Sequence, residues 1–93
     1  MSEYIEIETE LSDDGQSMYF YTNLALTEEE TVEEYNGRSQ MEEGSPVAQA
    51  LSVIEGITYL RLEGSDMTVT CEPGAPWHAI VADITAALKD FFL

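Results

Sequence analysis

The hydrophobic positions along the chain follow two periods, which divide it into strands and helices. Apolar and polar residues alternate over residues 4–11, 17–26, 57–63 and 67–71, as expected for strands with one buried face. Over residues 45–56 and 77–91 the apolar spacing changes to three and four, which is typical of amphipathic helices. The pattern predicts the order strand, strand, helix, strand, strand, helix.

Each predicted strand has a set of side chains that share one face. In the first two strands the sets are Ile5, Ile7, Thr9 and Leu11, and Met18, Phe20, Thr22 and Leu24. In the third strand Thr58, Leu60 and Leu62 share one face, and Ile57, Tyr59, Arg61 and Glu63 share the other. In the fourth strand the set is Met67, Val69 and Cys71. The turn chemistry of residues 12–16 and 64–66 predicts two hairpins.

Both helices have recognisable starting residues. Ser45 is a helix cap, Pro46 suits the first helical position, and Gly56 is expected to end that helix in the left-handed conformation. Pro76 likewise suits the first position of the last helix. Its predicted buried stripe is Trp77, Ile80, Val81, Ile84, Leu88 and Phe91, with Phe92 and Leu93 off the stripe.

Residues 27–43 are acidic and have no clear period. A Thr27 cap followed by glutamates favours a short helical turn, whereas residues 31–35 are also compatible with a short edge strand, which we favour slightly. Asn36 and Gly37 then form a turn, and residues 38–44 are expected to be a connector without regular structure.

These elements predict an α+β fold of two layers. A largely antiparallel sheet of four to five strands carries two helices on one face, in the order β-β-(β)-α-β-β-α. The chain has 93 residues and no linker long enough to separate two domains, so residues 1–93 are predicted to form a single domain.

One set of residues in the second half of the chain follows a known pattern: Ser45, Pro46, Ala48, Ala50, Leu51, Ile54, Gly56, Ile57, Gly64, Asp66, Met67, Thr68, Val69 and Thr70. With these residues the second half of the chain resembles the N-terminal domain of the Nfu/NifU-type iron–sulfur scaffold proteins. A tryptophan that opens the last helix, here Trp77, extends this resemblance.

The sequence departs from the pattern of that family at several places. Ser52 replaces the usual phenylalanine and Cys71 the usual lysine. Over residues 1–43 the resemblance covers only the order of strands, and residues 12–15 replace an Asn-Pro-Asn loop. In full-length relatives the cluster-binding C-x-x-C lies in a separate C-terminal domain, and this sequence has no C-x-x-C. The resemblance therefore implies a stand-alone domain that does not itself hold a cluster.

The charge of the chain is strongly negative. Three Lys and Arg against nineteen Asp and Glu give a formal charge of −16, and residues 1–45 carry −12 of it. Such a field repels nucleic acids and anionic membranes and favours proteins with basic surfaces. A solubilising surface or halophilic adaptation would produce the same excess of acidic over basic residues without any partner. The residues predicted to bind a partner are Glu28, Glu29, Glu30, Glu33, Glu34, Glu42 and Glu43.

Few residues offer catalytic chemistry or metal ligands. Cys71 is expected to be an inert core thiol, and His78 a surface residue near the start of a helix. Two chains would supply only two cysteines, too few for an iron–sulfur cluster. Residues 28–34 lack the spacing of a calcium loop. We therefore expect no catalytic, cofactor or metal site.

The sequence thus predicts a non-catalytic protein-interaction module, accessory to iron–sulfur cluster assembly or delivery. Its expected partners are proteins with basic surfaces, such as iron–sulfur scaffolds or apoprotein targets. The chain itself is expected to be a monomer or a weak homodimer. The alternative is an acidic mimic that competes with nucleic acid for a basic protein surface. A lone cysteine, together with the lack of a leader or an apolar run that could span a membrane, favours the cytoplasm.

Overall fold

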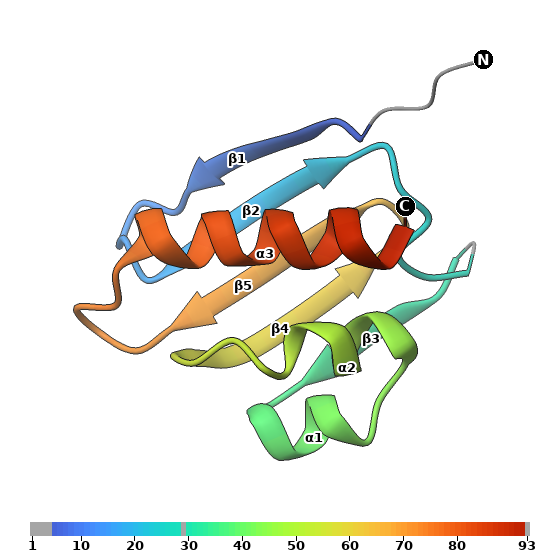
Figure 1. Ribbon diagram of the computed structural model, residues 1–93. Helices are drawn as coiled ribbons and strands as arrows, with labels where there is room; N and C mark the ends of the chain where they lie inside the picture. The colour runs from blue at the N-terminus through green and yellow to red at the C-terminus, as the bar shows by residue number, and fades with distance from the viewer. Residues whose placement is uncertain (1–4, 29, 93) are drawn as a thin grey trace.

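The computed structural model describes residues 5–28 and 30–92 and consists of an antiparallel sheet with helices against one face (Figure 1). The sheet has five strands in the order β1-β2-β5-β4-β3. Its strands are β1 (Ile7–Leu11), β2 (Ser17–Thr22), β3 (Val32–Tyr35), β4 (Ile57–Glu63) and β5 (Asp66–Cys71). The helices are α1 (Arg38–Glu42), α2 (Pro46–Leu51) and α3 (Trp77–Phe92). The predicted two-layer α+β architecture is confirmed.

The core lies between the sheet and the helices, because alternate side chains of each central strand point to the helix layer. Met18 and Phe20 of β2 are buried there, as are Met67, Val69 and Cys71 of β5. From α3 come Ile80, Ile84 and Leu88. The predicted core faces of these two strands and most of the α3 stripe are therefore confirmed.

The start of α2 is fixed to strand β3 by Tyr35. As predicted, Ser45 caps the helix, its Oγ accepting from the Ala48 amide at 3.4 Å, and Pro46 occupies the first turn. The Tyr35 hydroxyl donates to the Glu33 carboxylate and accepts from the Ser45 amide at 3.1 Å. The Tyr35 ring lies so close to Gly44 that a Cβ there would be 2.3 Å from Tyr35 Cε1. Only glycine fits at position 44 while this ring keeps its place.

The acidic middle segment contains more regular structure than predicted. The edge-strand alternative is confirmed by β3, which pairs with β4. The connector predicted over residues 38–44 is wrong, because Arg38–Glu42 form the short helix α1. Met41, 1% exposed, is the apolar side chain that holds this turn against the core. A single apolar residue in a polar run gives no periodic pattern, so the sequence did not predict the helix.

Three further expectations are corrected. Helix α2 ends at Leu51, five residues before Gly56, whose φ of 97° belongs to the following turn. A register irregularity between Ile57 and Tyr59 buries Ile57 and leaves Thr58 exposed, the reverse of what strict alternation implies. At the end of α3, Phe91 is 44% exposed and Phe92 packs on the core instead.

The outer parts of the first two predicted strands also differ from the expectation. β1 begins at Ile7 and β2 ends at Thr22, so both are shorter than the apolar alternation suggested. Thr9 and Leu11 of β1 are exposed although they share a face with Ile7. The reason is that β1 is an edge strand, and α3 lies across β2 and β5 rather than over β1 (Figure 1).

Candidate functional site

Cys71 and His78 lie in different surroundings in the structure. Cys71 is buried at the end of β5, and burial, followed by the nearby Glu72 carboxylate, raises the pKa of its thiol to about 11. A thiol with so high a pKa is a poor nucleophile at neutral pH. His78 is exposed near the start of α3. Over residues 5–28 and 30–92, no three His, Cys, Asp or Glu side chains converge as a metal site would require.

The acidic residues predicted to bind a partner follow the β3 edge of the sheet. Glu28 and Glu30 lie in the loop before β3, Glu33 and Glu34 on β3, and Glu42 and Glu43 at the end of α1, while Glu29 lies outside the described residues. They do not form one patch. Since neighbouring residues of a strand point to opposite faces, Glu33 contacts Tyr35 on the helix side and Glu34 points to the other side.

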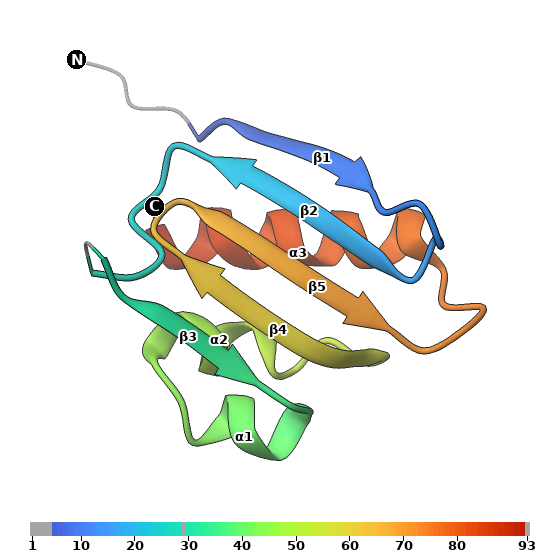
Figure 2. The same cartoon turned by 180° about the vertical axis from the view of Figure 1, so that it is seen from behind.

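The structure reveals a second candidate surface, the sheet face that the helices leave open (Figure 2). The strand register places on it acidic side chains from four strands, three tyrosines and one arginine. These residues are Glu8 and Glu10 of β1, Tyr19 and Tyr21 of β2, Asp66 of β5, Tyr59, Arg61 and Glu63 of β4, and Glu34 of β3. We call this set the open sheet face.

Hydrogen bonds join the aromatic and acidic residues of the open sheet face in pairs. The Tyr21 hydroxyl donates to Glu10 Oε1 at 3.1 Å, and this bond raises the pKa of Tyr21. The Tyr59 hydroxyl donates to Glu34 Oε2 at 3.0 Å, and desolvation followed by this bond raises the pKa of Tyr59. Both tyrosines therefore stay protonated at neutral pH, with their rings held in place on the sheet.

The charges on the open sheet face are poorly balanced. Arg61 is the only basic residue among the described ones that the register places there, and it contacts Glu63 at 3.2 Å and Glu34 at 3.9 Å. Glu63 and Asp66 stand directly opposite each other across the β4–β5 hairpin. Like charges in this position repel each other, so a cation placed between them would be favourable.

The sequence indicated which residues of each strand lie on its polar face, but not that these residues share one surface. The alternation had placed Glu8 and Glu10 on a wet face of one strand, and Tyr19 and Tyr21 opposite the apolar side of the next. Which strands become neighbours depends on the order β1-β2-β5-β4-β3, which cannot be deduced from the periodicity of single strands. The local pattern could indicate polar aromatic positions, but not that they share a surface.

Comparison with known proteins assigns the chain to a family. The family described as "Scaffold protein Nfu/NifU N terminal" matches residues 7–93, almost the whole chain. The chain belongs to the Nfu/NifU N-terminal family. This family is of the scaffold type and is linked to iron–sulfur cluster assembly. The resemblance seen in residues 45–77 is thereby confirmed and extends over the N-terminal strands as well.

Two individual proteins are similar to this member of the family. NifU-like protein 4, mitochondrial, from Arabidopsis thaliana is 28% identical over 86 residues, which cover 92% of this chain and 30% of that protein. The chain thus spans less than a third of the length of this relative. The crystal structure of protein SAV1430 from Staphylococcus aureus has a TM-score of 0.72 at 14% identity, covering 89% of this chain and 98% of that one. At this identity the likeness shows the fold alone.

The helices of the described residues are short for a membrane span. The longest, α3, has 16 residues, and none of these helices combines the length and the apolar character needed to cross a membrane.

Proposed function

We propose that this domain is a non-catalytic protein-interaction module that acts beside iron–sulfur cluster assembly or delivery. Its partner is a scaffold, a carrier or a target apoprotein that presents a basic surface. Membership of the Nfu/NifU N-terminal family supports the link to cluster assembly. The observation that carries the proposal is the open sheet face, where carboxylates from four strands surround three tyrosines and a single arginine.

The chemistry of this face suits arginine and lysine side chains. A guanidinium group stacks on a tyrosine ring and pairs with a carboxylate, and Tyr21 with Glu10 and Tyr59 with Glu34 provide both next to each other. Tyrosines are also enriched in protein interfaces because they bury a large area at a small cost in conformational entropy. The glutamates along the β3 edge extend the negative potential beyond the sheet, and they form part of the proposal.

Docking on the open sheet face should depend strongly on charge. The charged groups of Arg61, Glu34 and Glu63 are exposed there, and complementary charge on a partner raises the association rate and contributes to the affinity. Salt screens exposed charges, so salt should weaken the complex.

A capture experiment with two matched variants tests the proposal. The wild-type chain is immobilised, exposed to extract from its native cells at low salt, and eluted with increasing salt before mass spectrometry. We expect iron–sulfur assembly proteins to be enriched and to elute in moderate salt. The double variant Glu10→Gln/Glu63→Gln on the open sheet face should lose them. The control His78→Lys/Ala82→Lys changes the formal net charge equally on the helix side, on the face of α3 towards β1, and should keep them.

Other results would contradict the proposal. If both double variants lost the captured proteins equally, net charge alone would account for the binding and the open sheet face would not be the docking surface. If the captured proteins were nucleic-acid-binding proteins displaced by duplex DNA, the acidic-mimic hypothesis would replace this one.

The proposal places the domain in a reducing compartment such as the cytoplasm. Its single buried thiol supports this location, although the plant relative is named as mitochondrial.

A further inference from the structure

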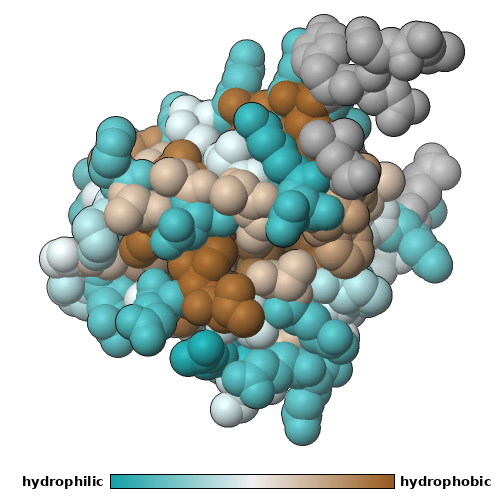
Figure 3. Space-filling model, in the orientation of Figure 1, coloured by the Kyte–Doolittle hydropathy of each residue, from teal (hydrophilic) through white to brown (hydrophobic). Residues whose placement is uncertain are grey.

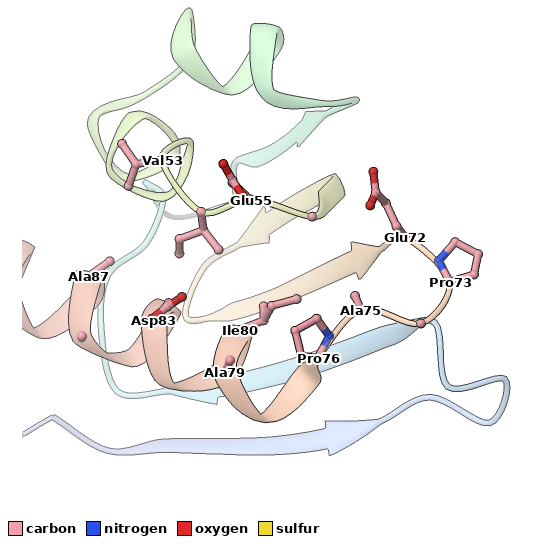
Figure 4. A pocket seen from close by; sticks show the side chains of 14 residues that line it. Val53, Glu55, Glu72, Pro73, Ala75, Pro76, Ala79, Ile80, Asp83 and Ala87 are labelled. Atoms are coloured by element: carbon pink, nitrogen blue, oxygen red, sulfur yellow. The ribbon is translucent and has the colours of Figure 1, made fainter.

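A groove lies on the helix side of the molecule, opposite the open sheet face. It runs between α3 and the segment that joins α2 to β4, and residues 72–76 close one end (Figure 4). Its volume is about 730 Å³. A smaller hollow of about 350 Å³ shares Val53 and Ala87 with it and continues it towards Phe91 near the end of α3. We call the two adjoining hollows together the α2–α3 groove.

The groove exists because small residues occupy the α3 wall. Ala79, Ala86 and Ala87 stand where longer side chains would fill the space, and Ile54 and Ile80 form an apolar floor. Apolar side chains also lie at its margin, where Val53 is 67% and Phe91 44% exposed. Figure 3 shows apolar surface between α3 and the segment below it. Covering such surface removes apolar atoms from water, so an apolar occupant would be stabilised here.

The rim of the groove is negatively charged. Glu55, Glu72 and Asp83 line the main hollow, and Asp90 lines its continuation. In Figure 4, Glu55 and Asp83 come from opposite walls and Glu72 from the closed end. No lysine, arginine or histidine is present among the described residues that line either hollow. The complementary occupant therefore combines an apolar stripe with flanking cations.

The walls of the groove select the shape of the occupant. An extended segment binds well at a strand edge, where its backbone groups find partners. The edges of this sheet are β1 and β3, whereas the groove lies between helical segments on the face above the sheet. A helix satisfies its own backbone and needs only side-chain contacts. The 16 residues of α3 span about 24 Å, which matches a partner helix of about four turns.

A second copy of the chain does not fit this description. Each copy carries a formal charge of −16, and the margins of two such grooves would repel each other. We therefore propose that the α2–α3 groove binds an amphipathic helix of a partner protein, with an apolar face of small and branched residues and with lysine or arginine on both flanks. This site lies on the other side of the sheet from the proposed docking surface and does not depend on it.

The test uses a synthetic peptide and nuclear magnetic resonance. A 15-residue helix with leucine and alanine on one face and lysine on both flanks is titrated into the full chain labelled with nitrogen-15. We expect saturable shifts of the amides of Val53, Ala79, Asp83 and Ala87. A scrambled peptide of the same composition, which has the same charge but no apolar face, should bind at least about tenfold more weakly.

Variants on one helix separate the groove from general charge attraction. Ala79→Gln fills the groove with a neutral side chain and should weaken binding about tenfold, and Asp83→Lys should weaken it about three- to tenfold at low salt. The matched control Ala82→Gln makes the same substitution on the β1 side of α3, beside Trp77 and His78, and should leave the affinity unchanged.

Three outcomes would overturn the proposal. The first is the absence of saturable shifts at millimolar peptide. The second is a set of shifts centred on Tyr19 and Tyr59, which would place the peptide on the open sheet face. The third is concentration-dependent shifts of the groove amides without peptide, which would make a second copy the occupant. A folded spectrum of each variant before titration ensures that lost binding is not lost structure.

Discussion

Leu60 and Arg61 are neighbours on β4, but their surroundings have nothing in common. Leu60 is fully buried beneath the helices, whereas Arg61 lies on the open sheet face beside Glu34 and Glu63. The same contrast holds along β2, where buried Phe20 separates Tyr19 and Tyr21, which are 37% and 43% exposed. One set of strands therefore carries two independent surfaces. The covered face supplies stability, and the open face is the surface that we propose for recognition.

The largest expected effect comes from a cavity on the covered side. Ile84→Ala removes a side chain that is 0% exposed on α3, and we expect the free energy of unfolding to fall by about 2–5 kcal/mol. The control is Val32→Ala on β3, where the side chain is 45% exposed and the register places it on the uncovered side, with an expected loss below about 1 kcal/mol. Urea denaturation measures both free energies of unfolding. Equal decreases in the two variants would contradict the claim that the covered face supplies the stability.

A smaller effect is expected where the helix layer is attached to the edge of the sheet. In Gly44→Ala the new Cβ would collide with the Tyr35 ring, and moving this ring should cost about 1–3 kcal/mol. In a Tyr35→Ala background the ring is absent. The same substitution should then be neutral or stabilise by up to about 1 kcal/mol, because alanine restricts the unfolded chain. A loss of equal size in both backgrounds would show that the ring is not the cause.

The third effect appears only in alkali. Burial raises the pKa of Cys71 from an ordinary value of 9.0 to about 11 in the folded chain. The stability contributed by the protonated thiol is complete below pH 8 and is lost as the pH rises towards 11, by about 2 kcal/mol at that pH. In Cys71→Ala this part of the pH dependence should disappear, while tyrosine titration remains in both proteins. Parallel pH curves for the two proteins would contradict this account of the thiol.

Much of the covered face could be predicted because local patterns report burial directly. The alternation of Met18 and Phe20, and the spacing of Ile80, Ile84 and Leu88, indicated which side chains face the core. The Ser45 cap was equally clear. The failures have identifiable causes. Phe91 fits the helical stripe, but near the end of α3 the chain packs Phe92 instead. The irregularity at the start of β4, which buries Ile57, interrupts an alternation that looked continuous.

The candidate sites were less predictable because they are formed by several elements. Glu34 was among the expected acidic residues, but its hydrogen bond to Tyr59 joins positions 25 residues apart. Glu55 and Asp83 likewise line opposite walls of the groove, which forms only when α2 and α3 pack side by side. Charge and residue type could be taken from the sequence, but the grouping required the strand order and the helix packing.

The order of strands also has a consequence for synthesis of the domain. The last strand of the chain, β5, lies in the middle of the sheet between β2 and β4. As the polypeptide leaves the ribosome, the first hairpin has no central neighbour until residues 66–71 emerge, and a lone hairpin in water is marginally stable at best. The five-stranded sheet can therefore be completed only after β5 has been made, late in the synthesis of the domain.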